Sequence, residues 1–138
     1  MSRLEKLLYT AKSHTIRGRE GASRSSDGHL DVQLSRPGGP GVGTNPEQLF
    51  GAGWSASFQN AMGLAAHSMK VELPSDLGID AEIDLWTRDG EFFLQARLKI
   101  HLPGVERDVA QVLADAAHRT CPYSKALRED MDVTINLI

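Results

Sequence analysis

The order of strand-like and helical segments predicts an α+β fold with antiparallel sheet. In several stretches apolar and polar residues alternate, which is the pattern of half-buried strands. Two other stretches have the composition or spacing of helices, and they separate the strands along the chain. With 138 residues and 41% hydrophobic content, the chain has the size of a single globular domain over residues 1–138.

The opening third of the chain is predicted to form strands. Residues 7–12 alternate and lead to a turn-prone stretch at residues 18–21, and a second turn is expected at residues 26–28. Residues 30–34 then alternate as a half-buried strand. The Gly- and Pro-rich residues 36–43 lack the Gly-Lys-Ser/Thr of a phosphate-binding loop, so a connection is the preferred interpretation.

A long helix is predicted from Pro46 to about Lys70. Asn45 can cap it, Pro46 suits the first helical position, and Gln48 stands three residues after the cap. Residues 48–69 contain no charged residue, but their Gln, Asn, His and Ser residues are too polar for a membrane span. The many small residues of this helix indicate close packing on several sides, part of which a second subunit can supply.

A hairpin, a second helix and a final strand follow. Residues 79–85 and 92–100 alternate on either side of an Asp-Gly turn, which predicts two antiparallel strands. Apolar residues at helical spacing predict a helix over residues 106–120, which Pro122 interrupts. Residues 132–137 alternate once more as the last strand.

Composition excludes several classes of function. The net charge of −3 and the absence of a Lys/Arg cluster argue against nucleic-acid binding. The amino-terminal residues show no apolar signal region, and a lone cysteine suits a reducing compartment, so we expect a cytoplasmic protein. The five histidines stand at no metal-ligand spacing, so no metal is expected. We expect no cofactor either.

Cys121 and Ser57 are the first two candidates for chemistry. A lone cysteine is more often a buried, inert thiol, but Cys121 stands at a predicted helix break, where a thiol can be presented. Residues 53–57 approach the Gly-x-Ser-x-Gly nucleophile motif without matching it, and small residues for helix packing are the simpler interpretation of Ser57. No His and Asp accompany Ser57 by motif, which argues against a serine hydrolase.

Arg19 and Glu47 are the next candidates. Glu47 falls in the first turn of the long helix, where the dipole alone favours an anion, and Arg19 on its turn is by default a solvated surface residue. Phe50, Trp54 and Phe58 recur at a spacing of four on one stripe of the helix. Such a stripe is usually core, although it can also accept an alkyl or fatty-acyl chain.

Over nearly its whole length the chain resembles the organic hydroperoxide resistance (Ohr) branch of the Ohr/OsmC family. The matching blocks, in order, are residues 4–6 (LEK), 8–11 (LYTA), 18–21 (GREG), 25–28 (SSDG), 43–50 (GTNPEQLF), 115–118 (DAAH) and 121–124 (CPYS). The resemblance implies an OsmC-like fold, in which antiparallel sheets wrap around long central helices in an intertwined homodimer. It also implies reduction of organic hydroperoxides to alcohols by a pair of cysteines, with a lipoylated protein or dihydrolipoyl dithiol as the reductant.

By motif, the resemblance assigns four roles. Cys121 takes that of the resolving thiol, Arg19 that of the group that stabilises the attacking thiolate, and Glu47 that of the group that holds the arginine. The attacking cysteine falls at position 57, where this chain has Ser57. Phe50, Trp54 and Phe58 are then expected to line the substrate site.

Serine at position 57 predicts an inactive peroxidase, because a hydroxyl is a much weaker acid than a thiol and oxygen cannot follow the sulfenic-acid route. Since Arg19, Glu47 and Cys121 are all present, the pattern indicates a Cys→Ser change in an active enzyme. A natural relative without the thiol is the alternative origin. The competing function is a non-catalytic module that binds hydrophobic small molecules.

Overall fold

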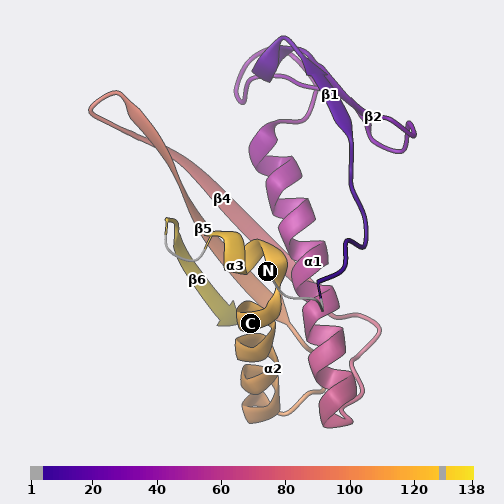
Figure 1. Cartoon of the computed structure of the whole chain (residues 1–138). Helices are drawn as coiled ribbons and strands as arrows, with labels where there is room; N and C mark the ends of the chain where they lie inside the picture. Colours follow the sequence, from indigo (N-terminus) through magenta and orange to yellow (C-terminus); the bar gives the residue numbers. More distant parts are fainter. Residues whose placement is uncertain (1–4, 128–129) are drawn as a thin grey trace. The chain divides into compact units, whose positions relative to one another are not determined.

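The computed structural model describes residues 5–127 and 130–138. The chain divides into two compact units, Met1–Pro46 and Glu47–Ile138, and each is described by itself (Figure 1). The assignment of one domain to residues 1–138 stays a prediction.

The amino-terminal unit is a small antiparallel sheet. It contains β1 (Ser13–Ile16), the 3-10 helix η1 (Gly18–Glu20), β2 (Ala22–Ser25) and β3 (Asp31–Gln33), with strand order β1-β2-β3. Gly21 makes the return after η1 possible, because a Cβ there would lie 1.8 Å from the carbonyl oxygen of Ile16. The predicted turn at residues 26–28 and the strand after it are confirmed.

The strand predicted over residues 7–12 is wrong. Strand pairing begins only at Ser13, and residues 5–12 have no regular structure. Leu7 and Leu8 are 82% and 84% exposed, so neither of the two alternating sets of side chains in this segment is buried within the unit. Alternation predicts a strand only where one face of it is buried, and neither face of this segment is buried within its own unit.

Three helices belong to the carboxy-terminal unit, which begins one residue into the first of them. They are α1 (Pro46–Met69), α2 (Arg107–Thr120) and α3 (Pro122–Leu127). The first two confirm the predicted helices, whereas α3 was not predicted. At the end of α1, Lys70 adopts a left-handed conformation (φ 58°), and the Val71 N–H donates to the Ala66 carbonyl at 2.8 Å. This bond and the one from the Lys70 N–H to the His67 carbonyl at 3.2 Å satisfy two of the carbonyls near the end of the helix.

The second sheet has the order β4-β5-β6, formed by β4 (Gly78–Arg88), β5 (Glu91–His101) and β6 (Asp132–Leu137). The hairpin is confirmed, with Asp89 and Gly90 both at positive φ in its turn. The expectation of purely antiparallel sheet is wrong at β6, which pairs parallel to β5. The connection through α2 and α3 carries the chain back along the sheet, so that β6 begins beside Gln95 and runs in the same direction as β5.

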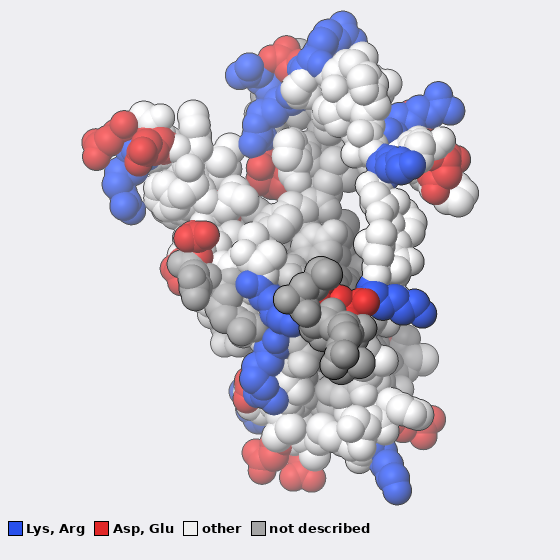
Figure 2. Space-filling view, in the orientation of Figure 1, with Lys and Arg blue, Asp and Glu red and all other residues white. Residues whose placement is uncertain are grey.

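One buried cluster joins the helices of this unit to its sheet. α1, β5 and α2 supply most of its members, which are Trp54, Phe58, Ala61, Met62, Ala96, Leu98, Ile100, Leu102, Ala110, Ala114, Ala117 and Cys121. α1 therefore has a packed side within its own unit, as its small and apolar residues predict. Among the described residues, no helix is both long and apolar enough to cross a bilayer. On the face drawn in Figure 2, positive and negative side chains are interspersed.

Candidate active site

Cys121 occupies the junction of two helices. Its extended backbone (φ −60°, ψ 124°) ends α2, and its N–H donates to the Ala117 carbonyl at 2.8 Å. Pro122 begins α3, and the carbonyl of Cys121 accepts the Lys125 N–H at 2.9 Å. The helix break predicted from Pro122 is therefore confirmed, and the break is followed at once by a new helix that starts from Cys121.

The structure brings Ser57 and Cys121 together. The Sγ of Cys121 lies 3.5 Å from the Oγ of Ser57 and donates a hydrogen bond to it, across 64 residues of sequence. Cys121 has no exposed surface, whereas Ser57 on α1 is partly exposed. The cysteine is buried, as most lone cysteines are, but it faces a polar atom on another helix instead of packing only against apolar groups.

Ser124 and Tyr123, which motif reasoning did not single out as site residues, connect α3 to α1. The indole Nε1 of Trp54 donates to the Oγ of Ser124 at 3.1 Å, and both residues are fully buried. Tyr123 covers Gly53, where an added Cβ would lie 3.3 Å from the phenol oxygen. The available signal was Trp54 itself, since a tryptophan buried in a core needs an acceptor for its N–H.

The aromatic stripe lies mainly in the core. Trp54 and Phe58 have no exposed surface and belong to the buried cluster, while Phe50 is partly buried with its ring centroid 5.6 Å from that of Trp54. Within the carboxy-terminal unit, packing accounts for Trp54 and Phe58. The role of the three residues in lining a substrate site stays a prediction.

Arg19 and Glu47 belong to different units. Arg19 is half-buried on η1, directly after Arg17 and Gly18, which both adopt positive φ. Glu47 lies in the first turn of α1, as predicted, where the helix dipole favours its negative charge. Their pairing with each other and with position 57 stays a prediction.

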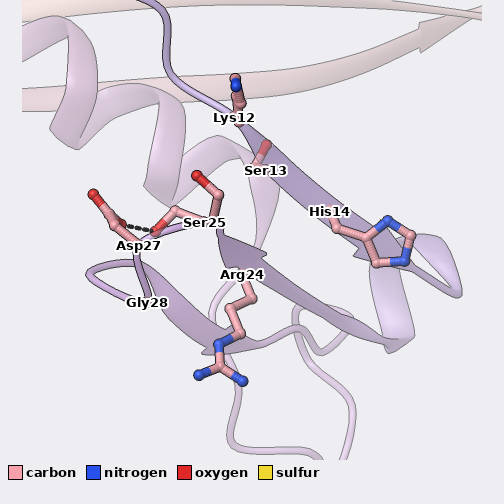
Figure 3. Close-up of a pocket in the computed structure, with 8 residues that line it drawn as sticks. Lys12, Ser13, His14, Arg24, Ser25, Asp27 and Gly28 are labelled. Atoms are coloured by element: carbon pink, nitrogen blue, oxygen red, sulfur yellow. Dashed lines mark hydrogen bonds between the residues drawn. The ribbon is translucent and has the colours of Figure 1, made fainter.

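The amino-terminal unit carries an open pocket of about 450 Å³, which contains none of the predicted site residues. Its lining consists of Lys12, Ser13, His14, Arg24, Ser25, Ser26, Asp27 and Gly28. The Asp27 carboxylate accepts hydrogen bonds from Ser25 Oγ at 2.6 Å and from the His29 N–H at 3.0 Å, and these bonds lower its pKa. In Figure 3 the side chains of Lys12, His14 and Arg24 diverge, so they do not converge on one ligand atom.

No metal site is apparent in the part of the chain that the structure describes, because no group of three or more His, Cys, Asp or Glu side chains there is arranged to hold an ion.

Comparison with known proteins places this arrangement in a family. The profile of the OsmC-like protein family matches residues 38–136, and the chain belongs to that family. Within it, the organic hydroperoxide resistance protein of Xanthomonas axonopodis pv. citri (strain 306) is 44% identical over 141 aligned positions, covering 99% of both chains.

Solved structures agree with the fold. The crystal structure of the organic hydroperoxide resistance protein OhrB of Bacillus subtilis matches with a TM-score of 0.90 at 38% identity, covering 96% of this chain and 100% of the other. A putative organic hydroperoxide resistance protein of Vibrio cholerae O1 biovar eltor, with captopril bound in one of its active sites, matches with a TM-score of 0.89 at 34% identity. The coverage is 98% of this chain and 95% of the other. The predicted OsmC-like α+β fold is thereby confirmed.

Proposed function

We propose that this protein has the scaffold of a cysteine-based organic-hydroperoxide reductase, and that serine at position 57 makes the present form inactive. The observation that carries the proposal is the 3.5 Å contact between Ser57 Oγ and Cys121 Sγ, in a chain that belongs to the OsmC-like family. A thiol in place of that hydroxyl would start from a separation that a small movement closes to the roughly 2.0 Å of a disulfide.

The proposed reaction needs two thiols. A thiolate at position 57 attacks the outer peroxide oxygen of ROOH, the O–O bond breaks, and the products are a sulfenate and, after protonation, the alcohol ROH. The Cys121 thiolate then attacks the sulfenic sulfur, which releases water and forms the 57–121 disulfide. A dihydrolipoyl dithiol, free or on a lipoylated protein, returns both sulfurs to thiols and leaves as its cyclic disulfide.

Serine stops this sequence at its first step. The Ser57 hydroxyl is a far weaker acid than a thiol, and an arginine nearby does not close that gap. An oxygen nucleophile also has no counterpart of the sulfenic acid and disulfide that carry the two electrons. Whether the serine is natural or introduced, the chemistry is the same.

The remaining roles follow from the family resemblance. Arg19 stabilises the attacking thiolate, Glu47 holds Arg19, and Phe50, Trp54 and Phe58 contribute apolar surface for an alkyl or fatty-acyl hydroperoxide. The relatives named for organic hydroperoxide resistance, and the captopril bound in an active site of the Vibrio cholerae protein, support a site for small organic molecules. We further propose that the protein is a cytoplasmic homodimer.

Restoring the thiol tests this proposal. The Ser57→Cys protein is expected to consume cumene hydroperoxide with dihydrolipoamide as reductant, whereas the original Ser57 protein and Ser57→Ala are not. Ser55→Cys is the matched control, because it adds a thiol to the same helix but on a different face. We expect at least a hundredfold higher turnover for Ser57→Cys than for Ser55→Cys, roughly the contribution of correct positioning.

A folded Ser57→Cys protein that leaves the peroxide unconsumed and forms no 57–121 disulfide would overturn the proposal. It would favour the competing function, a non-catalytic module that binds hydrophobic small molecules. If Ser55→Cys turned over as fast as Ser57→Cys, the activity would still depend on a thiol, but position 57 would not be the specific place of the attacking thiol.

A further inference from the structure

We infer that the buried hydrogen bond between Trp54 and Ser124 positions the resolving thiol, which makes these two residues positioning residues for the second step of the reaction. The inference rests on the proposed function and gives these residues a role in the chemistry that the proposal above does not. It is carried by the 3.1 Å bond from Trp54 Nε1 to Ser124 Oγ, which joins positions 70 residues apart.

Helix α3 is joined directly to Cys121. α3 begins at the residue after Cys121, and its first turn closes on the Cys121 carbonyl through the 2.9 Å bond from the Lys125 N–H. Ser124 lies in that same turn and has no exposed surface. A contact that fixes Ser124 therefore also fixes the backbone from which the Cys121 thiol extends.

The other partner of this hydrogen bond, Trp54, lies on the same face of α1 as position 57. Trp54 precedes Ser57 by three residues and Gly53 precedes it by four, so all three stand on adjacent turns of one helix face. Tyr123 packs on Gly53 while Ser124 bonds to Trp54, which docks two consecutive residues of α3 on one turn of α1. This docking sets the spacing between Cys121 Sγ and the side chain at position 57.

The hydrogen bond adds direction to a contact that packing alone would leave loose. The indole N–H of Trp54 has one donor direction, and the short Ser124 side chain meets it only when α3 keeps its present rotation. Without the hydroxyl, Trp54 keeps its shape but α3 loses this constraint. Disulfide formation depends steeply on the placement of the two sulfurs, so the resolving step is where the loss appears.

The test uses the Ser57→Cys protein as its background and separates two steps. The first readout is the rate of sulfenic-acid formation with cumene hydroperoxide, measured by trapping with a cyclic dione. The second is the rate of 57–121 disulfide formation, measured by mass spectrometry. The third readout needs no peroxide. It is the equilibrium constant for the exchange in which two protein thiols and one oxidised glutathione give the 57–121 disulfide and two reduced glutathiones.

Adding Ser124→Ala to this background is expected to leave sulfenic-acid formation unchanged. Disulfide formation and the glutathione equilibrium constant should each fall roughly tenfold, the scale of one buried hydrogen bond. Ser124→Thr, which keeps the hydroxyl, should recover most of the loss. Trp54→Phe is read only in the glutathione equilibrium, because Trp54 is also expected to line the substrate site. Its glutathione constant should match that of Ser124→Ala, and the constant of the double variant should be no lower than that of either single variant.

Equal disulfide rates and equal glutathione constants with and without Ser124→Ala, compared per folded molecule, would overturn the inference and leave the proposed function intact. Independent, additive losses in the double variant would also overturn it, because the two residues would then not act through their shared bond. Should Ser124→Ala fail to fold, Trp54→Phe alone decides through the same constant. If the Ser57→Cys protein forms no sulfenic acid, the proposed function fails, while the glutathione equilibrium still tests the positioning.

Discussion

At the scale of single residues, Cys121 combines complete burial with a polar neighbour. Its thiol is a member of the cluster formed by α1, α2 and β5, yet its Sγ donates to the hydroxyl of Ser57. Composition and local patterns identified both positions but not their contact. Motif resemblance supplied the pairing, while the 3.5 Å separation depends on how α1 and α3 pack, which no local pattern records.

Burial predicts slow labelling of Cys121. In the folded protein, reaction with a disulfide reagent such as DTNB should be at least about tenfold slower than in urea, because the thiol must wait for local opening. The matched control combines Thr120→Cys with Cys121→Ser, which moves the only thiol by one residue to an exposed position. Equal labelling rates for the two proteins would show that Cys121 is accessible.

At the scale of elements, the β4–β5 hairpin carries an ionic network on one face. The Arg97 guanidinium donates to both carboxylate oxygens of Asp84, at 2.7 and 2.8 Å, and to Glu82 at 2.7 Å. These bonds lower the pKa of Asp84 and, together with Lys99, that of Glu82. The network therefore stabilises the hairpin only while both carboxylates are ionised.

The network predicts a loss of stability in acid. Because both pKa values are lower in the folded state than the usual 3.8 and 4.5, the stabilisation is present above about pH 5 and disappears as pH falls through the folded-state values. In urea unfolding experiments between pH 7 and pH 2, the free energy of unfolding should fall less for Arg97→Gln than for the original protein. Lys99→Gln, which affects Glu82 alone, should lie between that variant and the original. Parallel curves for all three proteins would contradict this account.

The elements also show how far sequence patterns reach. The α1 helix, the hairpin and the α2 helix were predicted nearly to their ends. The hairpin and α2 have an apolar periodicity that matches burial within their own unit, whereas α1 was located by its amino-terminal capping signals and its apolar, small-residue composition. The parallel pairing of β6 was missed, since alternation gives a strand but not its direction. The strand predicted over residues 7–12 is absent for a different reason, because neither face of that segment is buried in the unit that contains it.

At the scale of the whole molecule, exposed apolar surface supports the proposed homodimer. β6 pairs only with residues 95–100 of β5, so the hairpin continues beyond it as a two-stranded ribbon (Figure 1). Four large apolar residues of that ribbon are exposed, namely Leu85, Trp86, Phe92 and Phe93. A two-stranded ribbon with exposed apolar side chains is marginally stable alone, and a second subunit is the covering that we propose.

Sedimentation equilibrium tests the dimer. The protein should have about twice its chain mass of 15.1 kDa. Phe92→Lys, at a side chain that is 74% exposed, should shift the population toward the monomer by placing a charge in the covered surface. His101→Lys, exposed at the other end of β5, is the control and should leave the mass unchanged. A monomer for the original chain, or equal masses for all three proteins, would contradict the assembly proposed for the ribbon.

The most direct test of the central claim is the mass of the Ser57→Cys protein after one equivalent of cumene hydroperoxide. The account predicts loss of about two mass units on disulfide formation, a cross-link between the peptides that contain positions 57 and 121, and one equivalent of alcohol. The original protein, with Ser57, should show none of these changes. A Ser57→Cys protein that stays reduced with its peroxide intact, or that is oxidised only at Cys121, would contradict the account.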